Sequence, residues 1–424
     1  MKVLWFANNA CGSVRRNKGR VITGGWLISL EDELKKCKDI ELAVAYITPR
    51  EESDFVFEGV HYYPAARPVD RNGIKRVIQR YESLETGEKR IVPLLLEIVK
   101  KVSPDIIHIH GTEECFGLIQ DYIQNIPIVF SIQGFIAPIA EKFYSGLPAD
   151  RLKRYEPMTK RVRRVSFLDS YRSFEFRGNR ELNYLQKVRY VIGRTFFDHS
   201  ISLLCNPDVN LYQGEEILRS PFYEAKWDKD FFDTPLKIVS TISGGIYKGY
   251  ETALHAAGLL KRYAKFPFEW QIIGYDVSSE WVGYAERYKQ LDSQEVGMKL
   301  LGRKDAAEMI EIMKAADIFV QVSHIENSPN SLCEAMLLGM PCIASFAGGT
   351  ASLLENNREG ILVQDGDPYV LAGTIVNLHN RFEDAKKMGK NARGRATSRH
   401  NPQDICNNLI SVYENIIENE RKHK

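Results

Sequence analysis

Two glutamates eight positions apart lie in the stretch of the chain whose residue types and spacing are most specific for chemistry. This stretch, SHIENSPNSLCEAMLLGMPCIASFAGG at Ser323–Gly349, has the pattern of a strand end, a polar loop, a helix, a second strand and a glycine loop. Glu326 falls in the polar loop and Glu334 in the opening turn of the helix. Backbone N–H groups at the start of a helix attract anions, and here they belong to Asn330–Leu332. The pattern predicts an anion site with two carboxylates nearby.

A simpler role is also open to Glu334. A helix is predicted over Ser331–Leu338, and Ser331-Leu-Cys-Glu334 matches the S-x-x-E capping box, in which the glutamate only reaches back to a backbone N–H group. A capping box does not account for Glu326 or for the rest of the polar loop. Ligand binding and capping both stay open, and they compete for the same carboxylate.

A lysine follows another predicted strand. Lys248 stands between Tyr247 and Gly249 in the loop GGIYKG, and a helix is predicted to begin at Tyr250. A lysine in this place can put its ammonium group on a phosphate held at the helix N-terminus. The alternative is an ordinary solvated lysine.

Two histidines end a strand in the first half of the chain. His108 and His110 are two residues apart and therefore point to the same face of the strand. His110, followed by Gly111, is the better candidate for the mouth of a cleft. The alternative is a buried structural histidine. A zinc site would need a third ligand of similar character nearby, and the sequence shows none.

A pair of glycines precedes the first predicted helix, Gly25–Lys36. Gly24 and Gly25 would let the backbone approach a ligand at the helix N-terminus, although paired glycines also form ordinary turns. Neither the dinucleotide-binding G-x-G-x-x-G pattern nor a Walker A motif occurs at these loops. Nucleotide oxidoreductases and P-loop NTPases are therefore disfavoured.

Near-continuous apolar strands alternate with amphipathic helices along the chain, as in parallel sheets covered on both faces. The predicted strands are Lys2–Ala7, Glu41–Ile47, Asp105–His110, Pro127–Gln133, Ile238–Ser243, Trp270–Gly274, Lys299–Gly302, Ile318–Ser323, Pro341–Ser345 and Gly360–Val363. We predict an α/β fold with two doubly wound, Rossmann-like domains over residues 1–218 and 219–400. A C-terminal helical tail over 401–424 is expected to pack back towards the first domain. The two domains are expected to face a central cleft, because ligands bind beyond the carboxyl ends of such strands.

Composition excludes several classes of protein. The chain has 424 residues, enough for two or three domains, and ordinary globular proportions of apolar and charged residues. A net charge of +2 argues against a nucleic-acid partner. The seven cysteines are scattered without a C-x-x-C pair, which favours a reducing cytoplasm. No apolar run approaches the roughly 20 residues of a spanning helix, so a soluble or peripheral protein is expected.

From Met298 to Leu371 the chain resembles the C-terminal half of glycosyltransferase family 4. The resemblance rests on the E-x7-E pair Glu326 and Glu334, the run EAMLLGMPCIAS, the pair Gly348–Gly349 and the run EGILV. It is close over Lys237–Ala372 and patchy over the first half. It implies a GT-B fold and a retaining transfer of a sugar from a nucleoside diphosphate sugar to a glycan or lipid-linked acceptor, in bacterial cell-surface polysaccharide synthesis.

The resemblance also implies a role for each motif residue of the second half. Glu326 and the amides after it would hold the hydroxyl groups of the transferred sugar, and Glu334 would bind the ribose. Lys248, in the pair Lys248–Gly249, and the helix start at Asn330, Ser331 and Leu332 would take the diphosphate.

In the first half the resemblance implies that the glycine loop at Gly24 and Gly25 closes over the diphosphate. His110 would contact the sugar near the reacting carbon, which makes it a catalytic residue with Lys248 and Glu326. Two departures stand out: the arginine usual before the Lys-Gly pair is missing from STISGGIY, and SIQG lacks the histidine common before its glycine. Arg303 is one candidate to replace the missing phosphate contact.

Fixed cations and helix dipoles can stabilise a departing diphosphate without a metal ion. We therefore expect a metal-independent enzyme with no cofactor besides its co-substrate, for which a UDP-sugar is favoured. Two alternatives of other classes remain open, a sugar-nucleotide 2-epimerase of the same architecture and a non-catalytic nucleotide-sugar-binding protein.

The acceptor side is marked by a basic segment. Arg151–Tyr190 holds twelve Lys and Arg against four Asp and Glu, interleaved with aromatic residues. Such a segment could contact an anionic membrane surface or a lipid-linked pyrophosphate, which would place the protein on the inner face of the cell membrane. The alternative is a solvated helical hairpin.

Overall fold

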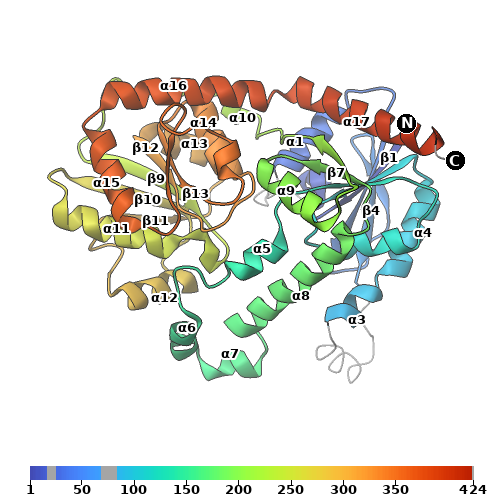
Figure 1. Cartoon of the computed structure of the whole chain (residues 1–424), viewed down its shortest axis with the longest axis horizontal. Coiled ribbons are helices and arrows are strands. Elements are labelled where there is room, and N and C mark those ends of the chain that lie inside the picture. The colour runs from blue at the N-terminus through green and yellow to red at the C-terminus, as the bar shows by residue number, and fades with distance from the viewer. Residues whose placement is uncertain (17–24, 68–83, 423–424) are drawn as a thin grey trace. The chain divides into compact units, whose positions relative to one another are not determined.

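The computed structural model describes residues 1–16, 25–67 and 84–422, and Figure 1 labels its helices and strands. The chain divides into two compact units. The first unit comprises Met1–Ala137, Ser173–Ile217 and Asn401–Lys424, and the second comprises Pro138–Arg172 and Leu218–His400. Gly24, one of the predicted site residues, lies outside the described residues.

The first unit is built on an eight-stranded sheet in the order β3-β4-β2-β1-β5-β6-β7-β8. Among the described strands of this sheet, only β3 runs antiparallel to its neighbour. The strands are β1 (Lys2–Ala7), β2 (Glu41–Thr48), β3 (Phe55–Phe57), β4 (Val60–Ala66), β5 (Ile106–His110), β6 (Ile128–Ser131), β7 (Tyr190–Gly193) and β8 (Asn210–Gln213). The pattern of the sequence predicted β1, β2, β5 and β6 but not the other four. Three of these lack a clear signal because they have only three or four residues, and β4 contains a proline.

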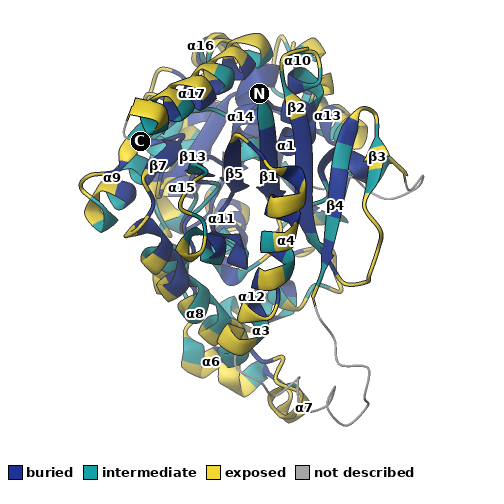
Figure 2. Ribbon diagram, turned by 90° about the vertical axis from the view of Figure 1, so that its right-hand side faces the viewer, coloured by how far each residue is buried: buried dark blue, intermediate teal, exposed yellow. Residues whose placement is uncertain are grey.

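Helices cover this sheet and complete two apolar clusters of the first unit. They are η1 (Cys11–Arg16), α1 (Gly25–Leu34), α3 (Leu84–Lys89), α4 (Val92–Val102), η2 (Cys115–Asp121), α9 (Phe196–Cys205) and α17 (Pro402–Lys422), with α5 (Ile136–Glu141) and α8 (Phe167–Leu185) crossing the unit boundary. Figure 2 shows the central strands β1 and β5 in the colour of buried residues.

The C-terminal helix α17 belongs to the core of the first unit. Its apolar residues, including Leu409 and Ile416, pack in the same cluster as Trp5. The hydroxyl group of Tyr413 accepts a hydrogen bond from the Trp5 indole at 3.0 Å and lies 2.5 Å from Nδ1 of His108. The helix therefore buries its apolar face and also satisfies polar groups inside the sheet.

The second unit is built on a six-stranded, all-parallel sheet in the order β11-β10-β9-β12-β13-β14. The strands are β9 (Leu236–Ile242), β10 (Phe268–Gly274), β11 (Met298–Gly302), β12 (Ile318–Gln321), β13 (Cys342–Phe346) and β14 (Ile361–Gln364), each matching a predicted strand. The chain order reverses between β9 and β12. In open α/β sheets the ligand binds beyond the carboxyl ends of the two strands at such a point.

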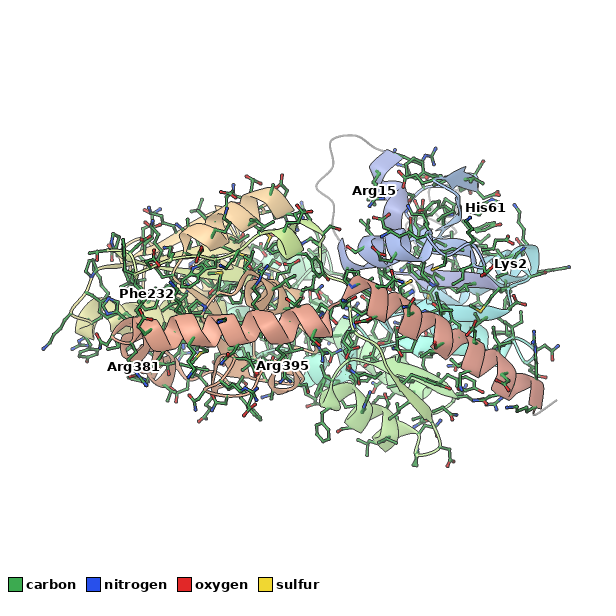
Figure 3. The ribbon with its side chains drawn as sticks, turned by 90° about the horizontal axis from the view of Figure 1, so that it is seen from above. Lys2, Arg15, His61, Phe232, Arg381 and Arg395 are labelled. Atoms are coloured by element: carbon green, nitrogen blue, oxygen red, sulfur yellow. The ribbon has the colours of Figure 1, made fainter. Side chains whose placement is uncertain are left out.

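The helices of the second unit are α6 (Ala149–Tyr155), α7 (Met158–Val162), α10 (Pro221–Glu224), η3 (Ile246–Lys248), α11 (Tyr250–Tyr263), α12 (Glu280–Lys289), α13 (Ala306–Ala315), α14 (Asn330–Leu338), η4 (Thr350–Ser352), α15 (Pro368–His379) and α16 (Phe382–Arg399). Arg381 and Arg395 mark the start and the later turns of α16 in Figure 3. Arg395 donates a hydrogen bond to the backbone carbonyl of Ser352 at 3.0 Å, which ties α16 to η4. In the part of the chain that the structure describes, no helix combines the length and apolar character of a membrane span.

The structure corrects the prediction of a continuous first domain over residues 1–218. Residues 138–172 make their contacts within the second unit. The rings of Phe167 and Trp281 lie 4.6 Å apart, and Tyr155 stacks with Tyr284 at 6.4 Å. Aromatic packing on α12 thus places residues 138–172 in the second unit. The sequence pattern of this segment does not indicate that α12 is its partner.

Candidate functional site

Three loops meet beyond the carboxyl ends of β9, β12 and β13 in the second unit. The Lys248 ammonium, after β9, lies 2.6 Å from Oε1 of Glu326, after β12. The hydroxyl group of Ser323 donates to the same carboxylate oxygen at 2.9 Å. The structure therefore brings together two of the predicted site residues, 78 positions apart in the chain, at the point where the strand order reverses.

Gly249 makes this approach of the loops possible. Its φ of +75° lies in the left-handed region, where side chains are strained. A Cβ atom at this position would also meet the backbone carbonyl oxygen of Val322 at 2.0 Å. The backbone of Lys248's loop can therefore lie directly against the end of β12 only if this residue is glycine.

The Glu326 loop is held on its other side by the glycine pair after β13. The N–H group of Gly349 donates to the backbone carbonyl of Glu326 at 2.9 Å. At Gly348, with φ of +53°, a Cβ atom would lie 2.0 Å from the same carbonyl oxygen. The glycine pair therefore positions the backbone that carries Glu326.

Lys248 remains charged in this setting. Burial alone would lower the pKa of its ammonium group, but the Glu326 carboxylate and the Tyr247 hydroxyl outweigh burial and hold the pKa above its ordinary value. Lys248 thus offers a fixed positive charge, and the side chain is still about a quarter exposed. Such a charge can stabilise a phosphate oxygen.

Helix α14 begins at Asn330, and Pro329 occupies its N-cap position without a side-chain hydrogen bond. The capping-box interpretation of Ser331 and Glu334 is therefore wrong, because Ser331 already lies inside the helix. Within the described residues, the backbone N–H groups of Asn330 and Ser331 have no acceptor. The N–H group of Leu332 donates to the carbonyl of Pro329 at 3.0 Å, so the predicted third anion-binding amide is already used.

Glu334 forms a bidentate ion pair with Arg219. The two oxygens of the carboxylate accept from Nε and Nη2 of the guanidinium group, each at 2.6 Å. Burial raises the pKa of Glu334 and the arginine acts against that rise. A carboxylate has about four lone-pair positions, and the backbone N–H group of Arg219 also donates to this one, so at least one position remains for another donor. Sequence reasoning missed Arg219, because the two residues lie 115 positions apart.

His324 is a second residue that sequence reasoning missed, although it stands within the quoted motif. Its Nδ1 lies 2.6 Å from Asp365, after β14, and its Nε2 lies 2.7 Å from Glu251 in the first turn of α11. These two carboxylates overcome the effect of burial and raise the pKa of His324 to about 9. A buried imidazolium thus ties the Glu326 loop to two neighbouring elements.

The stability of the protein should therefore fall in alkaline solution. Because the pKa of His324 is raised from 6.5 to about 9 on folding, its contribution is complete below about pH 6.5 and disappears as the pH rises through 9. The full contribution is at most about 3 kcal/mol. We expect His324→Gln to lower the melting temperature at neutral pH and to flatten its decline between about pH 7 and 10. His255→Gln, at a half-buried histidine on α11, is the control; equal pH profiles for wild type and His324→Gln would refute the assignment.

His110 is fully buried, so the prediction that it lies at the exposed mouth of its strand is wrong. The rings of Trp5 and Trp26 stand over it at 4.5 and 5.9 Å. Burial, with His108 and Arg194, lowers its pKa well below the usual range, so the imidazole is neutral. In the described part of the chain neither ring nitrogen has a hydrogen-bond partner. The ring lines a cavity of about 20 Å³, enough for one water molecule.

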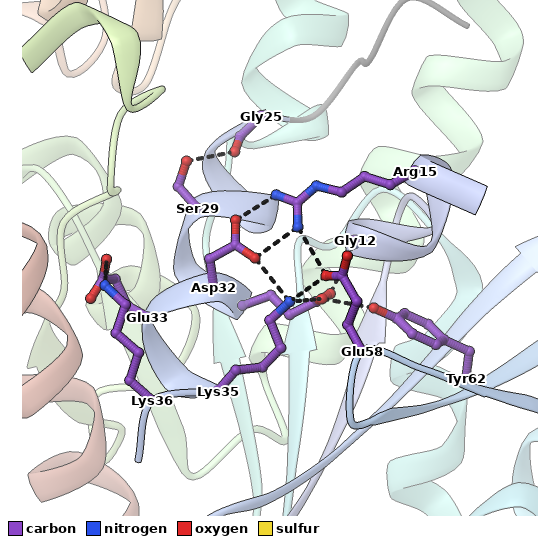
Figure 4. Close-up of polar contacts among 11 residues, drawn as sticks. Gly12, Arg15, Gly25, Ser29, Asp32, Glu33, Lys35, Lys36, Glu58 and Tyr62 are labelled. Carbon is purple, nitrogen blue, oxygen red and sulfur yellow. Dashed lines mark hydrogen bonds and ion pairs between the residues drawn. The ribbon is translucent and has the colours of Figure 1, made fainter. Parts of the chain in front are cut away.

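Gly25 is the first residue of α1 in the first unit, and its carbonyl accepts from the hydroxyl group of Ser29 at 3.0 Å. Figure 4 shows the polar contacts that fix this helix. Asp32 pairs with Arg15 at 2.5 Å, while the buried Glu31 accepts from the Tyr62 hydroxyl at 2.7 Å. The ion pair and the Tyr62 hydrogen bond hold the later turns of α1, and the ligand-binding role of Gly25 at its start stays a prediction.

Arg303 lies exposed just after β11, the edge strand of the second sheet. Among the described residues no hydrogen bond or ion pair links it to Lys248 or Glu326. Its role as the replacement for the missing arginine stays a prediction.

Comparison with known proteins gives a family match to the second unit and a fold match to the chain. Residues 222–395 match the family model described as glycosyl transferases group 1. The segment contains Lys248, Glu326 and Glu334, so the site described above lies within the matched region.

Two curated relatives share part of the chain. The amylovoran biosynthesis glycosyltransferase AmsK of Erwinia amylovora is 28% identical over 194 residues, which cover 44% of this chain and 47% of that protein. The UDP-Gal:alpha-D-GlcNAc-diphosphoundecaprenol alpha-1,3-galactosyltransferase of Escherichia coli is 29% identical over 123 residues, covering 28% of this chain and 30% of that protein. The chain therefore matches these relatives over half of their length or less.

The fold is shared over the whole chain with solved structures. Sucrose-phosphate synthase from Thermosynechococcus elongatus superposes with a TM-score of 0.71 at 15% identity, covering 98% of this chain and 99% of that one. The predicted fold class, α/β with two Rossmann-like units of the GT-B type and a C-terminal helix, is confirmed.

Proposed function

We propose that the protein is a retaining glycosyltransferase of family 4 that transfers a sugar from a nucleoside diphosphate sugar to a glycan or lipid-linked acceptor. The observation that carries this proposal is the Lys248–Glu326 pair beyond the switch point of the second sheet, within the segment that the glycosyl transferase family model matches. A UDP-sugar is favoured as donor, because one relative is named for a UDP-galactose donor.

In this proposal the diphosphate lies between the Lys248 ammonium and the open N–H groups of Asn330 and Ser331. Both supply fixed positive charge, and a preorganised charge lowers the barrier most where negative charge develops. Lys248 then shares its ammonium between Glu326 and a phosphate oxygen. Glu326 accepts hydrogen bonds from hydroxyl groups of the transferred sugar, which brings the anomeric carbon close to the diphosphate.

Glu334 binds the ribose with the lone-pair position that Arg219 leaves open. The roles that the resemblance implies for His110, Gly24 and Gly25 stay predictions, because His110 is fully buried and Gly24 lies outside the described residues. The roles of these first-unit residues rest on the resemblance described above.

The reaction breaks the bond between the anomeric carbon and an oxygen of the diphosphate. The acceptor oxygen forms its new bond on the same face of the sugar, and its proton passes to a phosphate oxygen of the leaving group. All of the positive charge assigned here comes from protein groups, so the proposed mechanism is independent of metal ions.

The proposed acceptor is a glycan or a lipid-linked sugar of bacterial cell-surface polysaccharide synthesis. Both relatives described above support this acceptor class by name, one through amylovoran and one through a diphosphoundecaprenol-linked sugar. A lipid-linked acceptor would place the protein in the cytoplasm, at the inner face of the cell membrane.

Donor binding is the first test. We expect UDP and UDP-sugars to raise the melting temperature in a screen of nucleoside diphosphates, since a ligand at 100 times its dissociation constant adds about 2.7 kcal/mol. Adenosine and guanosine diphosphates serve as matched controls. Stabilisation by none of the nucleotides would contradict a nucleotide-sugar enzyme.

Turnover separates the proposal from its two alternatives. With a lipid-linked acceptor we expect release of the nucleoside diphosphate and a product whose anomeric configuration, measured by NMR, equals that of the donor. An epimerised nucleotide sugar formed without acceptor would favour the 2-epimerase. Binding without any turnover over a panel of acceptors would favour a non-catalytic protein.

A further inference from the structure

The short helices α6 and α7 carry a dense group of positive charges. Between residues 151 and 165 there are seven Lys and Arg and a single carboxylate, Glu156. That carboxylate is buried, and it accepts a hydrogen bond from the backbone N–H group of Phe167 at 2.9 Å. The negative charge of this segment is thus turned inwards, while most of its cations are exposed.

The same segment exposes three apolar side chains. Met158, Val162 and Val165 are 69%, 75% and 60% exposed. Met158 and Val162 are four residues apart on α7 and therefore share one face of the helix. Figure 2 shows α7 in the colour of exposed residues. Clustered exposed apolar side chains commonly mark a surface that meets another molecule.

This surface is anchored to the body of the second unit. Lys160 forms an ion pair with Glu280 at the start of α12, and Phe167 packs against Trp281. The exposed side chains are therefore presented from a helix pair that is attached on its opposite side.

We propose that residues 151–165 form a docking surface for an anionic lipid bilayer. The apolar side chains of α7 enter the headgroup region, and the surrounding Lys and Arg side chains bind lipid phosphates. A nucleic acid would satisfy the cations but would offer nothing to three exposed aliphatic side chains, so the combination favours a bilayer. The proposal does not depend on the transferase activity, because it rests only on this surface.

The test is co-sedimentation of the full-length protein with phosphatidylcholine vesicles that contain or lack phosphatidylglycerol. We expect binding only to the anionic vesicles, weakened as the ionic strength rises to about 0.15 M and beyond. Each Lys or Arg near the surface contributes about fivefold to partitioning, so Lys153→Glu, Arg154→Glu and Arg163→Glu together should reduce it more than ~100-fold. The matched control reverses three exposed cations elsewhere in the second unit, Lys261, Arg262 and Lys265, and should retain most of the binding.

A second variant tests the apolar contribution without changing charge. Met158→Ser, Val162→Ser and Val165→Ser together should weaken binding at least ~10-fold while the melting temperature stays the same, because these side chains pack against little. Failure of the wild-type protein to sediment with anionic vesicles at low salt would overturn the proposal. Equal losses of vesicle binding in the control variant would also overturn it. A protein that binds single-stranded DNA but not anionic vesicles would do the same.

Discussion

Replacing Lys248 with alanine is expected to lower turnover by ~10²–10³ at saturating donor, the scale of removing one preorganised group that stabilises charge in the transition state. The ammonium group is fixed 2.6 Å from Glu326, beyond the switch point of the sheet. Its raised pKa keeps it charged over the neutral range. The measurement is nucleoside diphosphate release in single-turnover and steady-state assays.

Two controls make the Lys248 result specific. Lys314→Ala removes a half-buried lysine of α13 that pairs with Glu311 and should leave turnover unchanged. The melting temperature of Lys248→Ala reports whether the loop has merely lost its ion pair with Glu326. Wild-type turnover in a folded Lys248→Ala protein would exclude the proposed role.

Removing Arg219 is expected to have the largest effect on stability. Glu334 is buried and has its two oxygens bound by this one guanidinium group, so Arg219→Met leaves a buried carboxylate without its partner. Breaking a buried pair from one side costs about 3–5 kcal/mol. The loss should show as a lower midpoint in urea unfolding.

The variant Glu334→Gln tests ligand binding, and Arg219→Met, which keeps the Glu334 carboxylate, shows the effect of losing the ion pair alone. Glu334→Gln keeps the size of the side chain and should weaken nucleotide binding ~10–100-fold, because a hydrogen bond to a charged group contributes about 1.5–3 kcal/mol. Wild-type nucleotide affinity in Glu334→Gln would mean that the Arg219–Glu334 pair is only structural and would remove the ribose from the proposal.

The motif residues of the second half could be placed from the sequence because local patterns specify them. Lys248 and Glu326 each follow an apolar strand, and alternating strands and helices imply that the carboxyl ends of parallel strands share one edge of a sheet. The helix at 402–422 could be predicted for the same reason, since its 3.6-residue apolar period is a local property. The fold class and the positions of most strands along the chain therefore follow from the sequence alone.

Partners distant in the sequence were decided only by the tertiary structure. Arg219 and Glu334 are 115 positions apart, and His324 lies 73 and 41 positions from its two carboxylates. An ion pair of this kind leaves no periodic signal, because any of many Lys, Arg or His residues could satisfy a given carboxylate. The same holds for residues 138–172, whose aromatic side chains could pack on either unit until the fold brings α12 to them.

His110 shows most clearly what the sequence alone cannot predict about a site residue. The alternation of side chains along β5 predicts that His108 and His110 share a face, and their rings do lie 3.8 Å apart. Whether that face is open depends on Trp5 from β1 and Trp26 from α1, which close over the imidazole. Spacing along a strand determines which way a side chain points, but burial is set by elements that arrive from elsewhere in the chain.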